Sequence, residues 1–75
     1  MRYFFHVQEG KRHFPDEIGE DLPGTEAAWQ EATVTAGQLL HDLGGALKPG
    51  EEWRMRVTDD AGNLIWVLCL SVERH

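Results

Sequence analysis

Residues 53–70, WRMRVTDDAGNLIWVLCL, decide the fold because they form two strand patterns separated by a turn. The first pattern, residues 53–57, alternates between apolar and charged side chains, which is typical of a strand with one buried face. The second, residues 64–70, is apolar on both faces. Between them, residues 59–62 read DDAG, a four-residue turn in which Gly62 suits a positive φ. The stretch therefore predicts an antiparallel hairpin.

The register of this hairpin follows from keeping the buried faces of both strands together. A four-residue turn pairs Thr58 with Asn63, and the remaining pairs are then Val57 with Leu64, Met55 with Trp66, and Trp53 with Leu68. The opposite face carries the two arginines and the other half of the last strand, namely Arg54, Arg56, Ile65, Val67 and Cys69. Because the last strand is apolar on both faces, we expect it in the interior of a sheet.

A second hairpin is predicted at residues 2–14. Residues 2–8, RYFFHVQ, alternate as a strand, and residues 11–14 form a short charged strand that Pro15 stops. A short strand with Lys and Arg that ends at Pro is typical of a sheet edge. If residues 9–10, Glu-Gly, form a two-residue turn, His6 lies opposite His13.

A helix is predicted between the hairpins. Thr25 is a suitable N-cap, the helix follows over residues 26–43, and residues 44–45, Gly-Gly, supply a left-handed C-cap. Its apolar stripe consists of Ala28, Ala32, Thr35, Ala36, Leu39 and Leu43, flanked by Trp29 and Leu40. The small residues on this stripe should let the helix lie close to a sheet.

These elements predict one α+β domain over residues 1–75, with ββαββ topology. One long helix covers one face of a four-stranded sheet, above Trp53, Met55, Trp66 and Leu68. We place the two most apolar strands, the first and the last, side by side in the middle. The expected strand order is therefore 2-1-4-3, with a parallel central pair.

Composition restricts the class of function. The 75 residues carry a formal charge of −6, which argues against the nonspecific nucleic-acid binding that clustered Lys and Arg provide. The single cysteine, Cys69, excludes an internal disulfide. The longest apolar run, residues 64–70, is too short to cross a bilayer, and no signal-peptide pattern precedes it. We expect a cytoplasmic protein without membrane contact.

No catalytic or metal site is predicted. A zinc ion held by His6 and His13 would need a third and usually a fourth ligand, which no spacing in the chain demands. The acidic residues 16–21, DEIGED, lack the ligand spacing of a calcium loop. Ser71 has no nucleophile-elbow motif around it, and the apolar strand around Cys69 is a poor setting for a reactive thiol. We expect no enzyme activity, no cofactor and no small-molecule substrate.

Four motifs taken together resemble a known family. They are RYFFHVQEG at residues 2–10, PDEIGEDLP at 15–23, TEAAWQEA at 25–32 and the closing hairpin with DDAG. In this order and spacing they are similar to a family of short bacterial proteins, common in alphaproteobacteria, that is classed as a domain of unknown function. The resemblance covers almost the whole chain. It implies the ββαββ fold and no established activity.

The face of the sheet away from the helix is the candidate functional surface. The predicted pattern places on it Phe4, His6, Arg54, Arg56, Ile65, Val67 and Cys69. An aliphatic centre with arginines at its rim is typical of protein interfaces, so a homodimer or another protein partner is the favoured hypothesis. The alternative is a nucleic-acid-binding or regulatory module, because exposed aromatic and Arg side chains on a sheet also suit RNA.

Overall fold

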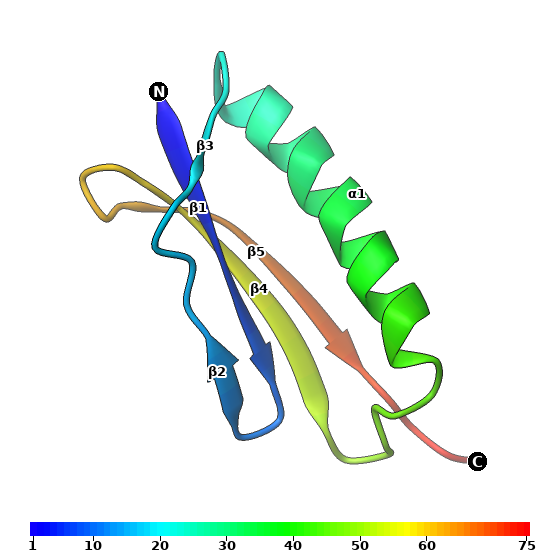
Figure 1. Cartoon of the computed structure of the whole chain (residues 1–75). Coiled ribbons are helices and arrows are strands. Elements are labelled where there is room, and N and C mark those ends of the chain that lie inside the picture. The colour runs from blue at the N-terminus through cyan, green and yellow to red at the C-terminus, as the bar shows by residue number, and fades with distance from the viewer.

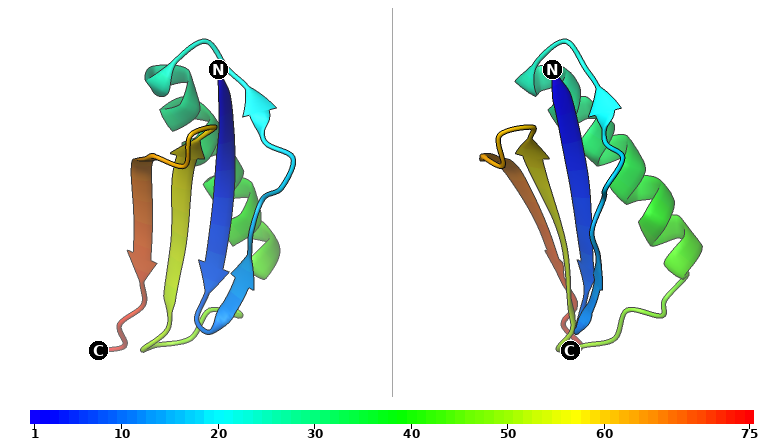
Figure 2. Two further views of the ribbon diagram at one scale, coloured as in Figure 1. Left: turned by 90° about the vertical axis from the view of Figure 1, so that its left-hand side faces the viewer. Right: turned by 60° about the vertical axis from the view of Figure 1, so that its left-hand side comes forward.

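The computed structural model describes residues 1–75 as one helix lying across one face of a five-stranded antiparallel sheet (Figures 1 and 2). The elements are β1 (Arg2–Glu9), β2 (Arg12–Phe14), β3 (Glu20–Asp21), α1 (Thr25–Leu43), β4 (Glu52–Asp59) and β5 (Leu64–Ser71). The α+β class and the long helix between two hairpins are confirmed. The fifth strand, β3, is a two-residue addition that the sequence did not predict.

The predicted strand order is wrong. The strands follow the order β2-β1-β4-β5, and β3 also pairs with β1. The neighbours in the middle are β1 and β4, which are antiparallel, and β5 lies at an edge. The reason is visible in the burial of β4, whose helix-facing side chains Trp53, Met55 and Val57 are at most 1% exposed. A strand with this row of large apolar side chains is best covered in the middle of the sheet, beneath the helix.

The register of the β4–β5 hairpin differs from the prediction by two residues. Met55 pairs with Leu68, and a β-bulge lies where Val57 pairs with Trp66 and Thr58 with Leu64. Asp59 explains the shift. It was predicted as the first residue of the turn, but it is the last residue of β4, and its carboxylate accepts hydrogen bonds from the turn that follows. The donors are the backbone N–H groups of Ala61 and Asn63, at 3.0 and 2.8 Å, and Asn63 Nδ2 at 3.1 Å.

The β1–β2 hairpin is also shifted by two residues. Gln8 lies opposite His13 and Glu9 opposite Arg12, so the turn is made by residues 10–11, with Gly10 at φ +58°. A positive φ is far easier for glycine than for the glutamate that a turn at residues 9–10 would require there. His6 consequently lies opposite Arg56 of β4, not opposite His13.

The helix packs through its predicted stripe. Ala28, Ala32 and Ala36 are at most 3% exposed and contact a core formed with Tyr3 of β1 and the buried row of β4. Partly buried apolar side chains surround this core, among them Phe5, Val7, Leu22, Trp29, Leu39, Leu40, Leu43, Leu47, Ile65, Trp66 and Leu68. No helix in the protein combines the length and apolarity that crossing a membrane would need.

The ends of the helix are capped differently from each other. The N-cap is Gly24 rather than the predicted Thr25, and no side chain caps this end. Trp66 of β5 instead donates its indole N–H to the Thr25 carbonyl oxygen at 2.9 Å, which ties the first turn to the sheet. The Trp66 ring also lies 5.1 Å from that of Trp29, centroid to centroid. At the other end Gly44 is left-handed with φ 59°, so the predicted C-cap is confirmed.

Candidate interaction surface

Two short strands, β2 and β3, pair with the outer edge of β1 and leave a gap between them. β2 pairs with the C-terminal end of β1 and β3 pairs with its N-terminal end, so residues 15–19 cross the gap between them. Within this gap the backbone N–H of Phe5 donates to Asp16 Oδ2 at 3.1 Å. A buried backbone donor needs a partner, and here a carboxylate replaces the carbonyl of a missing strand. Asp16 therefore completes the edge of the sheet.

The same carboxylate organises the loop that carries it. Asp16 Oδ1 accepts the N–H groups of Ile18 and Gly19 at 3.0 and 3.1 Å. Partial burial would raise the pKa of Asp16, but the hydrogen bonds from Phe5, Gly19 and Ile18 and the nearby His6 outweigh it and lower the pKa below 3.8. Ionised Asp16 therefore stabilises the fold at neutral pH, and this contribution is lost as the pH falls below 3.8, through the folded-state pKa.

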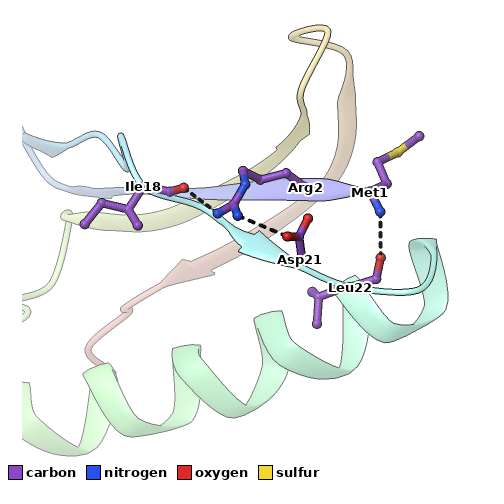
Figure 3. A network of polar contacts seen from close by, with 5 residues as sticks. All are labelled: Met1, Arg2, Ile18, Asp21 and Leu22. Atoms are coloured by element: carbon purple, nitrogen blue, oxygen red, sulfur yellow. Dashed lines mark hydrogen bonds and ion pairs between the residues drawn. The ribbon is translucent and has the colours of Figure 1, made fainter.

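A second group of contacts holds the end of this loop against β1 (Figure 3). Arg2 donates to the carbonyl oxygen of Ile18 at 2.8 Å and to Asp21 Oδ2 at 3.1 Å. The Met1 amino group also donates to the Leu22 carbonyl oxygen at 3.2 Å, and the Leu22 N–H donates to the Met1 carbonyl oxygen at 2.9 Å. The Arg2–Asp21 ion pair is exposed and contributes little by itself. Its value is positional, because it keeps the loop along the sheet.

His6 connects this loop to the central strand. The Asp16 N–H donates to His6 Nδ1 at 3.1 Å, and His6 Nε2 lies 3.0 Å from Thr58 Oγ1. Nδ1 of His6 is thus the acceptor in the first contact, and the opposite ring nitrogen contacts the Thr58 hydroxyl. The ring also stacks on Phe4, with centroids 6.4 Å apart and planes 11° apart. His6 is therefore held between the loop and β4, whereas His13 is an exposed side chain on β2.

We predict that the two histidines differ in their effect on stability. His6→Ala removes the acceptor of the Asp16 N–H and the partner of the Thr58 hydroxyl, and should lower the free energy of unfolding by about 1–2 kcal/mol. His13→Ala changes an exposed side chain, so its effect should stay within about 0.5 kcal/mol. Urea unfolding of both variants measures the difference. Equal losses would show that the hydrogen bonds of His6 contribute nothing to stability.

No group of three or more His, Cys, Asp or Glu side chains lies close enough together to hold a metal ion. A two-residue turn at residues 9–10 would place His6 and His13 opposite each other, where both imidazoles could contribute to a zinc site. In the observed register Gln8, and not His6, lies opposite His13, and the cross-strand neighbour of His6 on β4 is Arg56.

The open face of the sheet, on the side away from α1, keeps most of the residues predicted for it. Arg56, Val67 and Cys69 are exposed and Arg54 is half-exposed, on the adjacent strands β4 and β5. Phe4 and His6 are half-buried and engaged with each other and with the loop. Ile65 departs from the expected placement, because the β-bulge breaks the alternation and Ile65 packs against the core. The accessible part of the open face is thus its β4–β5 side.

The charges on this part are arranged around Arg54. Its guanidinium donates to Glu52 Oε1 from Nη2 at 2.6 Å and from Nε at 3.1 Å, and it lies across from Cys69. The hydrogen bond to Glu52, followed by the proximity of Cys69, raises the pKa of Arg54 above that of a free guanidinium. Arg56 makes no ion pair, since the pairs in the structure are Arg2–Asp21, Arg54–Glu52 and His75–Glu73. Arg56 is therefore the guanidinium available to a partner on this face.

Sequence reasoning overlooked the roles of Asp16 and Gly19. Both lie in the PDEIG segment, which was considered only as a possible calcium loop. The available signal was local, because an Asp whose side chain accepts N–H groups two and three residues on is a common turn device.

Most of the chain matches one protein-family model. Residues 2–71 match the model described as Domain of unknown function (DUF6894). The chain belongs to this family. No curated protein and no solved structure matches it. The matched residues include both hairpins, the helix, the Asp16 loop and the open face.

Proposed function

We propose that this chain is a non-enzymatic protein-interaction domain that associates with a second copy of itself through the β5 side of its sheet. The observation that carries the proposal is the distribution of exposed large hydrophobic residues. Three of the seven lie on β5; the full set is Met1, Phe14, Ile18, Val34, Leu64, Val67 and Leu70. The other four are scattered over separate segments, and scattered apolar residues are normal on a surface. Concentration on a single strand marks a contact surface.

The surroundings of Val67 suit a protein partner. Val67 is 41% exposed at the middle of β5 and lies opposite Arg56. An apolar centre beside an unpaired arginine is typical of protein interfaces, where Arg is enriched and other charges are depleted. Fully burying a Val or Leu side chain contributes about 1.5–3 kcal/mol. A two-fold contact buries the same patch in both copies, so a small domain gains twice from each residue.

We predict that Val67→Glu abolishes self-association while the monomer stays folded. The substitution places a charge at the middle of β5, on a side chain that is already substantially exposed. Light scattering combined with size-exclusion chromatography, from low to high micromolar concentration, should show dimers for the wild type and monomers for Val67→Glu. The matched control is Val34→Glu, which alters a 55% exposed valine on α1 and should leave the dimer intact.

Two results would contradict the proposal. A wild-type chain that stays monomeric at high micromolar concentration excludes self-association. Equal effects of Val67→Glu and Val34→Glu would show that added charge, rather than the β5 surface, governs association. Binding of an RNA or DNA oligonucleotide that weakens steeply with salt would favour a nucleic-acid module instead.

A further inference from the structure

The outer edge of β5 presents free backbone hydrogen-bonding groups. The Asp59 N–H donates to the Asn63 carbonyl at 3.0 Å, toward β5, whereas the Glu52 carbonyl accepts from Gly10 at 2.9 Å, toward β1. Because backbone groups alternate in direction along a strand, the odd-numbered residues of β4 bond to β5. Their partners on β5 are Trp66, Leu68 and Leu70, which bond back to β4.

The remaining residues of β5 therefore point their backbone groups away from the sheet. The N–H and C=O groups of Val67 and Cys69 face outward, and none of the hydrogen bonds outside the helix and strand ladders uses them. In Figure 2, β5 (orange to red) lies at one border of the sheet, and no other strand or helix lies beside its outer edge. A row of this kind is a template on which another strand can pair.

The two edges of this sheet are protected very differently. The edge on the β1 side has the three-residue strand β2 with Arg12, then Pro15, and then the loop in which Asp16 occupies the gap. β5 has none of these devices, since it is eight residues long, LIWVLCLS, and contains no Pro and no charged residue. Monomeric proteins normally protect an edge strand of this length against pairing with another chain. We take the unprotected edge as a site for strand addition.

We propose that β5 pairs with β5 of a second copy, antiparallel and about a two-fold axis perpendicular to the sheet, to give one continuous sheet through both chains. This inference rests on the proposed self-association and specifies its geometry. The argument for a second copy is that β5 is the only strand without a charged residue. Two molecules that each carry a formal charge of −6 can therefore meet there without placing like charges opposite each other. Contact through β5 brings two acidic molecules together along their one neutral strand.

A two-fold axis at Leu68 gives the best match of side chains. Val67 then lies opposite Cys69 of the second copy on the open face, and Trp66 lies opposite its Leu70 on the helix side. Both exposed residues in the C-terminal part of β5, Val67 at 41% and Leu70 at 39%, gain an apolar neighbour. The two helices lie on the same side of the joint sheet. The two open faces adjoin, and their Arg54 and Arg56 side chains line one larger surface.

Amide hydrogen exchange of the wild-type chain tests this geometry directly. The amides of Val67 and Cys69 should exchange rapidly at low micromolar concentration and about tenfold or more slowly at high micromolar concentration, where dimers form. The amide of Leu68, which bonds to β4 within the same chain, is the internal control. It should be protected at both concentrations.

A pair of variants tests the role of the outward N–H. Val67→Pro removes a donor that makes no bond inside the chain, and Pro is tolerated on an edge strand when its N–H side faces solvent. It should be folded by circular dichroism and monomeric, whereas Val67→Thr keeps both the N–H and the β-branch and should dimerise. If Val67→Pro does not fold, Cys69→Pro makes the same change one outward position further along.

Arg56→Glu separates edge pairing from face-to-face packing. Arg56 lies on the open face of the inner strand β4, one strand away from the paired edges, so Arg56→Glu should weaken an edge dimer far less than Val67→Pro does. Dimers whose Val67 and Cys69 amides exchange equally fast at all concentrations, and which Arg56→Glu dissociates, would overturn edge pairing but keep self-association. A wild-type chain that is monomeric throughout would overturn both.

Discussion

Replacing Trp53 with Ala is expected to lower the free energy of unfolding by about 3–5 kcal/mol, the usual cost of truncating a buried Trp. Trp53 is fully buried and is the largest of the fully buried side chains. Because the core of a domain this small rarely supplies more than about 3–5 kcal/mol, much of the Trp53→Ala chain should be unfolded even without denaturant. Urea unfolding followed by circular dichroism measures the loss.

A second substitution separates packing from hydrogen bonding at the same position. The indole N–H of Trp53 is buried and has no hydrogen-bond partner. Leaving such a donor unpaired costs free energy, so Trp53→Phe loses volume but also removes this cost. We expect Trp53→Phe to be far more stable than Trp53→Ala. A loss as large as that of the Ala variant would show that the indole makes an interaction beyond packing.

Trp66→Ala provides the comparison within the sheet. Trp66 is half-buried at the edge strand, where it contacts Trp29 and donates to Thr25. The sequence predicts that Trp66 lies beneath the helix, where its truncation would cost about 3–5 kcal/mol. With Trp66 at the edge, its truncation should cost less than that of Trp53. The reverse order would contradict the central position of β4.

The elements of this fold could be predicted from the sequence because alternation and helical periodicity are local signals. Trp53, Met55 and Val57 alternate with charged residues, and the structure buries all three beneath the alanine stripe of α1. The Gly pair after Leu43 likewise marks where the helix ends.

Strand order and register could not be predicted because the available signals are ambiguous. Apolar residues on both faces of β5 indicated an interior strand, but the same composition occurs at an edge that remains open for pairing. A register shift of two residues preserves which face each side chain occupies, so the pattern in residues 53–70 fits both registers equally well. The structure selects one through Asp59, whose carboxylate bonds the turn amides.

Only part of the candidate surface could be predicted, because only part of it follows the alternation of a regular strand. Arg54, Arg56, Val67 and Cys69 follow strand alternation and lie where the pattern places them. Ile65 falls in the β-bulge, which breaks alternation at a single residue. His6 depends on contacts with the distant residues Asp16 and Thr58, and no local pattern shows these.

The second large effect on stability is expected for Gly19→Ala in the loop between β2 and β3, and Gly62→Ala is its control. Gly62 has φ +83°, and a Cβ atom there would meet nothing within 4 Å. Its replacement therefore measures only the cost of placing Ala in the left-handed region, about 1–2 kcal/mol. Gly19 has a similar φ of +73°, which makes the two substitutions comparable in backbone strain.

Gly19→Ala is expected to lower the free energy of unfolding by about 2–4 kcal/mol, clearly more than Gly62→Ala. A Cβ at Gly19 would lie 2.9 Å from the Tyr3 carbonyl oxygen and equally close to the Arg2 and Phe4 side chains. The Tyr3 oxygen belongs to β1 and cannot move away, so the loop itself must shift. Such a shift pulls Asp16 from the Phe5 N–H, whose NMR resonance should move in this variant only. Equal losses in the two Ala variants would mean that backbone strain alone, and not the close approach to β1, requires glycine at position 19.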